Sequence, residues 1–212
     1  MKLKLYHYWR SSSSWRVRWA LALKQVPCEF IPINLLADEE STPAHLARNP
    51  MGYVPVLEIT ESEGAPLQFL GESVAIIEWL EELFPTPSLF HGNSFLKARS
   101  RQLAELINAG TQPLQNLNVS LHHSNDAEEQ KQWNQYWIRH GLKAYETLVA
   151  ETCGRFSVGD QLTLADLFLI PQCYNALRNE VPLQEFPLIE KINERALATE
   201  SCKAAAPERF KP

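Results

Sequence analysis

The chain has 212 residues, of which 45% are hydrophobic and 21% are charged, a balance typical of a folded globular protein and not of a disordered one. Its formal net charge of −5 argues against binding of nucleic acid or of an anionic membrane through bulk charge. The sequence shows neither a membrane-spanning apolar run nor the apolar core of a secretory signal, so we expect a cytoplasmic protein without nucleic-acid or membrane partners.

Alternating strand and helix signals fill the first 84 residues. Strands are predicted at Leu3–Tyr8, Phe30–Ile33, Val54–Ile59 and Gln68–Leu70, and helices at Ser13–Lys24, Thr42–Arg48 and Ser73–Phe84. The order β-α-β-α-β-β-α predicts a mixed sheet with helices on its faces. Pro32 predicts an edge position for the second strand, because proline cannot donate to a sheet ladder.

Strand signals end where Pro85 and Pro87 break the chain. Helices are predicted beyond this point at Phe95–Gly110, Ala127–Ala150, Thr163–Arg178 and Pro187–Thr199. The sequence therefore predicts an α/β domain over residues 1–84, a linker over 85–93 and an all-helical domain over 94–212.

The cysteines and histidines do not form a metal-ligand pattern. The four cysteines stand singly, at Cys28, Cys153, Cys173 and Cys202. The absence of a Cys-x-x-Cys pair gives no indication of a zinc knuckle or a dithiol redox centre. The adjacent pair His122 and His123 is predicted to be solvated surface. We expect free thiols, mostly buried, and no metal site.

Four consecutive serines, Ser11 to Ser14, lie where the first strand passes into the first helix. Serine is a common N-cap, and a plain serine-rich cap is one interpretation. The free N–H groups of a first helical turn also attract anions, and a hydroxyl there can donate a hydrogen bond to a thiolate or carboxylate. The segment alone leaves both interpretations open.

A capping box is predicted in the helical half. Thr163 is placed as N-cap with Asp166 three residues later, and Leu162 and Leu167 have the spacing of a hydrophobic staple. We assign this segment to folding and not to chemistry.

Several motifs together resemble the glutathione transferases. These are the Ser-Ser-x-Ser-Trp-Arg-Val-Arg segment after a strand, a central Val-Pro, a Glu-Ser before a helix, and the Thr-x-Ala-Asp cap. The resemblance is closest to the zeta class, which includes maleylacetoacetate isomerases, and it covers nearly the whole chain. The matching segments are Ser11–Leu23, Asn34–Leu35, Asn49–Met51, Ala75–Glu82, Gln112–Leu117, Pro171–Gln172 and Asn175–Ala176. It implies a thioredoxin-like domain followed by an all-helical domain, and a homodimer.

The resemblance also implies a glutathione site in the first domain. Val54 and Pro55 would form a cis-proline turn whose backbone pairs with the cysteinyl part of glutathione. Ser73 and the start of its helix would bind the γ-glutamyl carboxylate, and Glu72 would face the α-amine. Without the resemblance, Pro55 reads as a strand-entry proline and Ser73 as an ordinary cap.

The thiol of glutathione requires activation, because a free thiol with a pKa of about 8.5 is mostly protonated at neutral pH. The resemblance assigns Ser11 as the catalytic hydrogen-bond donor to the thiolate and Ser12 as a second donor. Arg16 would add positive potential, although Arg16 and Arg18 read equally well as surface charges. The implied glutathione-binding residues also include Ser13, Ser14 and Trp15.

The substrate is expected to contact the helical domain. Arg178 corresponds to the arginine that meets a substrate carboxylate in the family, and its alternative is an ordinary helix-surface arginine. The residues implied to line the site from this domain are Gln112, Asn116, Leu117 and Asn118.

The implied activity is glutathione-dependent cis–trans isomerisation of maleylacetoacetate or maleylpyruvate, in tyrosine and phenylalanine catabolism. A transferase that conjugates or dehalogenates another electrophile is the alternative. A non-catalytic binding protein of the same fold is a further alternative, against which the intact Ser11, Val54–Pro55 and Glu72–Ser73 set argues. A disulfide reductase is excluded because no cysteine occupies the serine motif.

The chain departs from the zeta pattern at three places. Ser13 stands where the class motif has cysteine, Glu72 stands where many members have glutamine, and the loop from Thr60 to Pro66 is long and acidic. Glutamate still suits the amine of glutathione, whereas the sequence leaves open whether Ser13 can take the place of the motif cysteine in positioning substrate.

Overall fold

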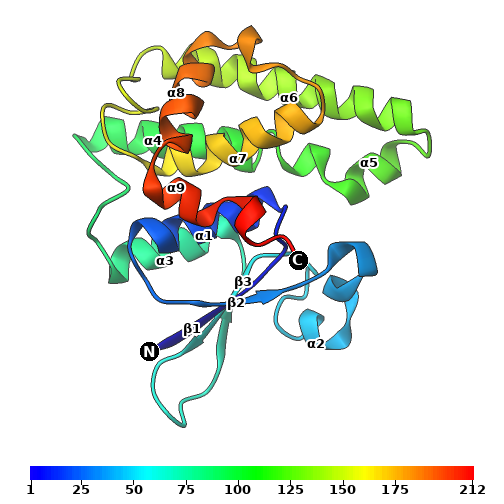
Figure 1. The fold of residues 1–212 in the computed structure, drawn as a ribbon, viewed down its shortest axis with the longest axis vertical. Helices are drawn as coiled ribbons and strands as arrows, with labels where there is room; N and C mark the ends of the chain where they lie inside the picture. The colour runs from blue at the N-terminus through cyan, green and yellow to red at the C-terminus, as the bar shows by residue number, and fades with distance from the viewer. The chain divides into compact units, whose positions relative to one another are not determined.

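The computed structural model describes all residues, Met1–Pro212, and they form two compact units. The first unit comprises Met1–Pro87 and Glu200–Pro212, and the second comprises Ser88–Thr199 (Figure 1). The predicted combination of an α/β unit and a helical unit is confirmed. Two details differ from the expectation: residues 200–212 belong to the α/β unit, and the expected linker over 85–93 is divided between the units.

The first unit contains a four-stranded mixed sheet in the order β2-β1-β3-β4. Its strands are β1 Lys2–His7, β2 Glu29–Pro32, β3 Val56–Thr60 and β4 Gln68–Leu70. β1 is parallel to β2 and antiparallel to β3, and β2 lies at an edge, as Pro32 predicts. β3 begins at Val56, two residues after the predicted start.

Helix α1, Ser12–Leu23, lies in the middle of this unit. It packs against α3, Ser73–Leu83, and against α9, Glu200–Ala205, on one side of the sheet (Figure 1). Residues 14–21 of α1 are all buried, polar and charged ones included, because neighbours cover the helix on several sides. The remaining helix, α2, is the short segment Pro43–Leu46.

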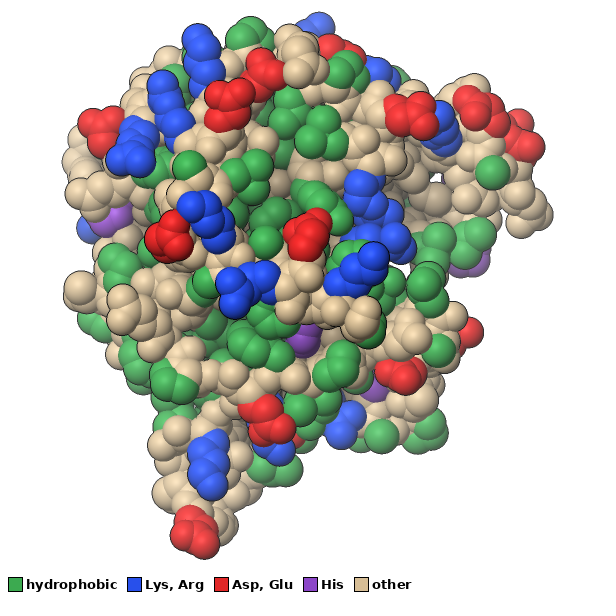
Figure 2. Space-filling view, viewed as in Figure 1, with side chains coloured by type: hydrophobic (Ala, Val, Ile, Leu, Met, Phe, Trp, Pro, Cys, Tyr) green, Lys and Arg blue, Asp and Glu red, His purple; other side chains and the backbone are tan.

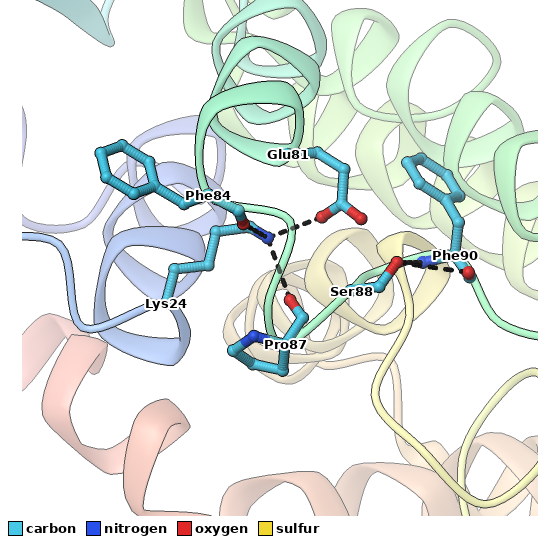
Figure 3. Close-up of polar contacts among 6 residues, drawn as sticks. All are labelled: Lys24, Glu81, Phe84, Pro87, Ser88 and Phe90. Atoms are coloured by element: carbon cyan, nitrogen blue, oxygen red, sulfur yellow. Dashed lines mark hydrogen bonds and ion pairs between the residues drawn. The ribbon is translucent and has the colours of Figure 1, made fainter.

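Lys24 closes the end of α1 with a fully buried ammonium group (Figure 3). Its Nζ donates to Glu81 Oε2 at 2.6 Å, to the Phe84 carbonyl at 2.6 Å and to the Pro87 carbonyl at 3.0 Å. The end of α3 and the proline-rich segment after it are therefore anchored on α1.

The second unit is helical. Its helices are α4 Ser94–Asn108, α5 Leu117–His123, α6 Ala127–Val149, α7 Leu164–Arg178 and α8 Pro187–Leu197. Helix α7 packs against α4 and α8, and residues 164–173 are all buried. Short 3-10 turns occur in this unit at Pro113–Gln115 and Leu183–Glu185, and in the first unit at Leu35–Ala37, Glu39–Ser41 and Pro207–Arg209.

Helix α5 was not predicted, because its seven residues are mostly polar and show no apolar stripe. His122 and His123 are exposed as expected, and the His123 ring also stacks on Trp133 with 4.2 Å between ring centroids.

The predicted capping box of α7 is confirmed. The Thr163 N–H donates to Asp166 Oδ2 at 2.8 Å, and the Ser157 N–H donates to Asp166 Oδ1 at 2.8 Å. Asp166 is fully buried, and these donors compensate the desolvation that raises the pKa of its carboxyl group.

None of the helices combines the length and the apolar character that a bilayer crossing requires. Acidic and basic side chains are interspersed over the face shown in Figure 2, in keeping with the modest net charge.

Candidate functional site

The start of α1 is built by Ser11, which is its N-cap. The Ser11 side chain accepts the Ser14 N–H at 3.2 Å, and the Ser11 N–H donates to the Tyr8 carbonyl at 3.1 Å. Because Ser11 Oγ acts as an acceptor in the cap, its own hydroxyl proton is available for donation to another group. The two interpretations of the serine motif, a cap and a donor to an anion, are therefore compatible.

The other serines of the motif differ in accessibility. Ser12 and Ser13 lie in the first turn of α1 and are partly exposed. Ser14 and Trp15 are buried, and Ser14 Oγ accepts the Tyr8 N–H at 3.4 Å. Ser14 and Trp15 thus lie in the interior beneath the first turn, and their contact with a ligand stays a prediction.

Arg16 joins the start of α1 to the start of α3. Its side chain is fully buried, and Nη1 donates to Ser73 Oγ at 3.2 Å. Ser73 is the first residue of α3, so this bond holds the beginnings of two helices together. The alternative interpretation of Arg16 and Arg18 as surface charges is wrong, because both are buried.

The residue before Ser73 has an unusual backbone. Glu72 has φ of 62° and ψ of 118°, outside the regions that non-glycine residues prefer, and its side chain is exposed. Such a conformation costs about 1–3 kcal/mol and tends to occur where a side chain is held for a function. Glu72 is therefore a candidate for ligand contact on geometry as well as on resemblance.

The Val54–Pro55 bond is cis, as the resemblance implies. Pairing of β3 with β1 begins at Val56, so the backbone of Val54 lies outside the ladder. The Tyr53 carbonyl just before it accepts from His45 Nε2 at 3.0 Å and from Asn49 Nδ2 at 3.1 Å.

His45 and Asn49 are supporting residues that the sequence did not single out. Both are buried, and a Cβ atom added at Gly71, the residue before Glu72, would lie 3.4 Å from Asn49 Nδ2. The Asn49–Pro50 turn signal could have drawn attention to Asn49. His45 lies in α2, within the helix predicted at Thr42–Arg48, but no motif marks it as a supporting residue.

These features suit an extended anionic ligand. The N–H groups at the start of α1 and α3 favour negative charge, Val54 offers backbone groups for strand-like pairing, and Glu72 offers a carboxylate for an amine. No cluster of three or more His, Cys, Asp or Glu side chains suited to a metal is present. All four cysteines are free thiols, and burial raises the pKa of Cys28 and of Cys202 to about 12.

The remaining predicted site residues belong to the second unit. Gln112 Nε2 donates to Asn116 Oδ1 at 2.5 Å, and Asn116 is the N-cap of α5. Leu117 and Asn118 follow in the exposed first turn of α5, and Arg178 is the exposed last residue of α7. The structure thus brings Gln112 and Asn116 together and places Arg178 on a different helix.

Comparison with known proteins gives consistent matches over both units. Residues 5–88 match the glutathione S-transferase N-terminal domain, and residues 114–204 match the C-terminal domain of the same family. The chain is 42% identical over 207 residues to the maleylacetoacetate isomerase of Mus musculus, covering 97% of this chain and 92% of the mouse protein. It is 39% identical over 211 residues to a zeta-class glutathione S-transferase of Euphorbia esula, covering 98% and 91%.

A similar solved structure is that of maleylacetoacetate isomerase from Anaeromyxobacter dehalogenans 2CP-1 with bound GSH in the active site. It superposes with a TM-score of 0.90 at 45% identity, covering 100% of this chain and 97% of that one. A further structure of the same protein, with bound dicarboxyethyl glutathione and citrate, has a TM-score of 0.89 at 44% identity, covering 100% and 96%.

Proposed function

The chain belongs to the glutathione S-transferase family, and on this premise we propose that it is a glutathione-dependent cis–trans isomerase of maleylacetoacetate or maleylpyruvate. The observation that carries the proposal is the junction of the α1 and α3 starts through Arg16 and Ser73, beside Ser11 and Glu72. It provides in one unit the groups that glutathione binding requires, in a chain similar over its length to isomerases of this kind.

Ser11 is the proposed catalytic residue. Its hydroxyl donates to the sulfur, and the N–H groups of the first turn of α1 add positive potential, so the thiol ionises more readily. Ser12 is the proposed second donor and Ser13 a neighbouring contact. When bound, glutathione supplies a thiolate that adds reversibly to the activated cis double bond of the substrate. The resulting single bond can rotate, and elimination then releases the thiolate and leaves the trans double bond.

The rest of glutathione is held by backbone and capping groups. Val54 pairs with the cysteinyl part, and Ser73 with the start of α3 binds the γ-glutamyl carboxylate. The Arg16–Ser73 bond orients the Ser73 hydroxyl as an acceptor from Arg16, which leaves its proton to donate to that carboxylate. Glu72 binds the α-amine.

Arg178 is proposed to bind a carboxylate of the substrate, because a guanidinium matches a carboxylate in a bidentate manner. Gln112, Asn116, Leu117 and Asn118 complete the proposed substrate contacts. The dicarboxyethyl glutathione and citrate in the similar structure support recognition of polycarboxylate groups at such a site.

We further propose that the protein acts as a homodimer in the cytoplasm, in catabolism of tyrosine and phenylalanine. The resemblance to the zeta class supports this setting. Sedimentation equilibrium across a concentration series checks the dimer, since a mass of one chain, 24.2 kDa, at every concentration would contradict it.

The decisive assay is glutathione-dependent isomerisation of maleylacetone or maleylpyruvate, followed by ultraviolet absorbance with glutathione quantified before and after. We expect turnover with glutathione recovered unchanged, which would also show that Ser13 serves in place of the motif cysteine. Consumption of glutathione with a thioether product would instead support the conjugating transferase. Binding of glutathione by calorimetry without any turnover would contradict the isomerase.

A further inference from the structure

The C-terminal segment Glu200–Pro212 returns to the first unit and lies against α1. The Trp19 Nε1–H donates to Ser201 Oγ at 3.0 Å, and Cys202 and Ala205 are buried. This attachment places a distant part of the chain beside the segment that carries Ser11, a juxtaposition that the proposed function does not use.

Arg18 connects the two segments. Its side chain is 1% exposed, and it lies two residues beyond Arg16 on α1. On the side of the C-terminal segment, Arg18 Nε donates to the Ala205 carbonyl at 3.2 Å, and the guanidinium lies 4.7 Å from the centroid of the Phe210 ring. One buried cation therefore holds both α9 and the residues that follow it.

On its other side Arg18 holds the turn that leads into the serine motif. Nη1 donates to the Tyr8 carbonyl at 3.2 Å, and Nη2 donates to the Trp9 carbonyl at 2.9 Å. The Tyr8 carbonyl also accepts the Ser11 N–H at 3.1 Å. Arg18 thus shares an acceptor with the backbone of Ser11 and fixes the turn from which the Ser11 side chain projects.

The last residues of the chain contact the same turn from outside. Two cations lie near the Trp9 ring, with the Arg10 guanidinium 5.5 Å and the Lys211 ammonium 5.8 Å from its centroid. The Arg18 and Lys211 contacts are independent, and both join the C-terminal segment to the turn Tyr8–Ser11.

The chemistry of this cluster requires arginine. Burial lowers the pKa of Arg18 to about 9, which leaves it protonated at neutral pH. His7 Nδ1 lies 3.1 Å from Nη1, and since burial lowers the pKa of His7 to about 4, its ring is neutral and accepts. Arg18 reaches four acceptors from three nitrogen atoms, whereas a lysine ammonium has three N–H donors on a single atom and cannot serve all four.

We propose that Arg18 is a positioning residue through which the C-terminal segment fixes the turn Tyr8–Ser11 and thereby the orientation of the Ser11 hydroxyl. We call the contacts of Arg18 with Ala205 and Phe210 on one side and with Tyr8 and Trp9 on the other the clasp. The catalytic consequence of the proposal rests on the proposed role of Ser11, whereas the clasp does not. The clasp is a property of the free protein and is measured without glutathione.

The first test is hydrogen–deuterium exchange of the Ser11 amide in the free protein. Arg18→Lys keeps the charge and loses the fork, and Phe210→Ala removes the aromatic contact on the side of the C-terminal segment. We expect exchange at Ser11 to rise about tenfold or more in Arg18→Lys, and to rise measurably in Phe210→Ala. Ser201→Ala is the matched control, because it weakens the same attachment of α9 to α1 without touching the turn, and Ser11 exchange stays at its original rate.

The second test is the pKa of the glutathione thiol in the complex, read from thiolate absorbance against pH. We expect Arg18→Lys to raise this pKa by about one unit, a tenfold loss of thiolate below the pKa, with Ser201→Ala unchanged. Unchanged Ser11 exchange in folded Arg18→Lys overturns the clasp. Raised Ser11 exchange with an unchanged thiol pKa overturns the claim that Arg18 orients the Ser11 hydroxyl. Absence of glutathione binding in the original protein overturns the proposed function but leaves the exchange test valid.

Discussion

At the scale of single residues, Ser11 serves two purposes that mutations can separate. The Ser11→Ala variant loses the cap acceptor and the donor together, whereas Ser11→Gly loses the donor and only a few tenths of a kcal/mol of cap stability. We expect both variants to lower kcat about ten- to a hundredfold, since each loses a hydrogen bond to a charged sulfur. Calorimetry should show a smaller loss in glutathione affinity. An equal loss in binding and in turnover would contradict the role of Ser11 as stabiliser of the thiolate.

A variant of Arg178 tests whether this residue binds a carboxylate of the substrate. The Arg178→Ala substitution should raise KM for a dicarboxylate substrate about tenfold, because one charged hydrogen-bonding partner of the substrate is removed. KM for an uncharged haloarene should not change. Steady-state kinetics with the two substrates checks this, and an unaltered KM for the dicarboxylate would remove Arg178 from the site.

His7 gives the fold a pH dependence. Burial and then the charge of Arg18 lower the pKa of His7 to about 4, while in the unfolded chain it titrates near its ordinary value of about 6.5. Between these two values the unfolded state binds more protons, so stability falls as the pH falls from about 6.5 to about 4. The His7→Asn variant keeps an acceptor for Arg18 but cannot titrate. Urea unfolding at pH 7 and pH 5 should show a smaller loss in the variant, and identical losses would refute the assignment to His7.

At the scale of secondary-structure elements, burial decides how much the loss of one partner of an ion pair lowers the free energy of unfolding. Lys24–Glu81 and Lys131–Glu180 have the same N–O distance of 2.6 Å, but the Lys24 side chain is fully buried whereas that of Lys131 is 35% exposed. Lys24→Met removes a buried cation and the donor to two carbonyls at the end of α3, so we expect a loss of about 3 kcal/mol. Lys131→Met is the control and should have little effect. Chemical denaturation of both variants tests the comparison, and equal effects would contradict it.

The elements that the sequence predicted well are those with local signals. Apolar periodicity located the strands and the long helices, and Thr163 with Asp166 predicted the cap of α7 because both partners of a capping box lie within four residues. Helix α5 has no such signal and was missed. The burial of Arg16 and Arg18 was also left open, because an arginine is enclosed only when distant segments supply acceptors such as Ser73 and Ala205.

At the scale of the whole molecule, the same limit explains the placement of residues 200–212. Helix α9, Glu200–Ala205, was not predicted, and its attachment to α1 depends on contacts such as that of Trp19 with Ser201, which are 182 positions apart in the chain. The candidate glutathione-site residues of the first unit were named from motifs. The residues that donate hydrogen bonds to the backbone beside them, His45, Asn49 and Arg18, were identified only from the structure.

The return of the C-terminal segment predicts that the first unit is much less stable without it. A chain ending at Thr199 loses the buried side chains of Cys202, Ala205 and Pro207 and exposes the α1 surface beneath α9. Burying side chains of this size contributes about 1 kcal/mol or more each, so we expect a loss of at least about 3 kcal/mol. The control is a chain ending at Phe210, which keeps α9 and Phe210 and lacks only two exposed residues. Urea unfolding should show a large decrease for the first truncation and a small one for the second, because the buried contacts of α9, and not the length of the chain, complete the first unit. Equal midpoints for the two truncated chains would show that α9 rests on a unit already complete without it.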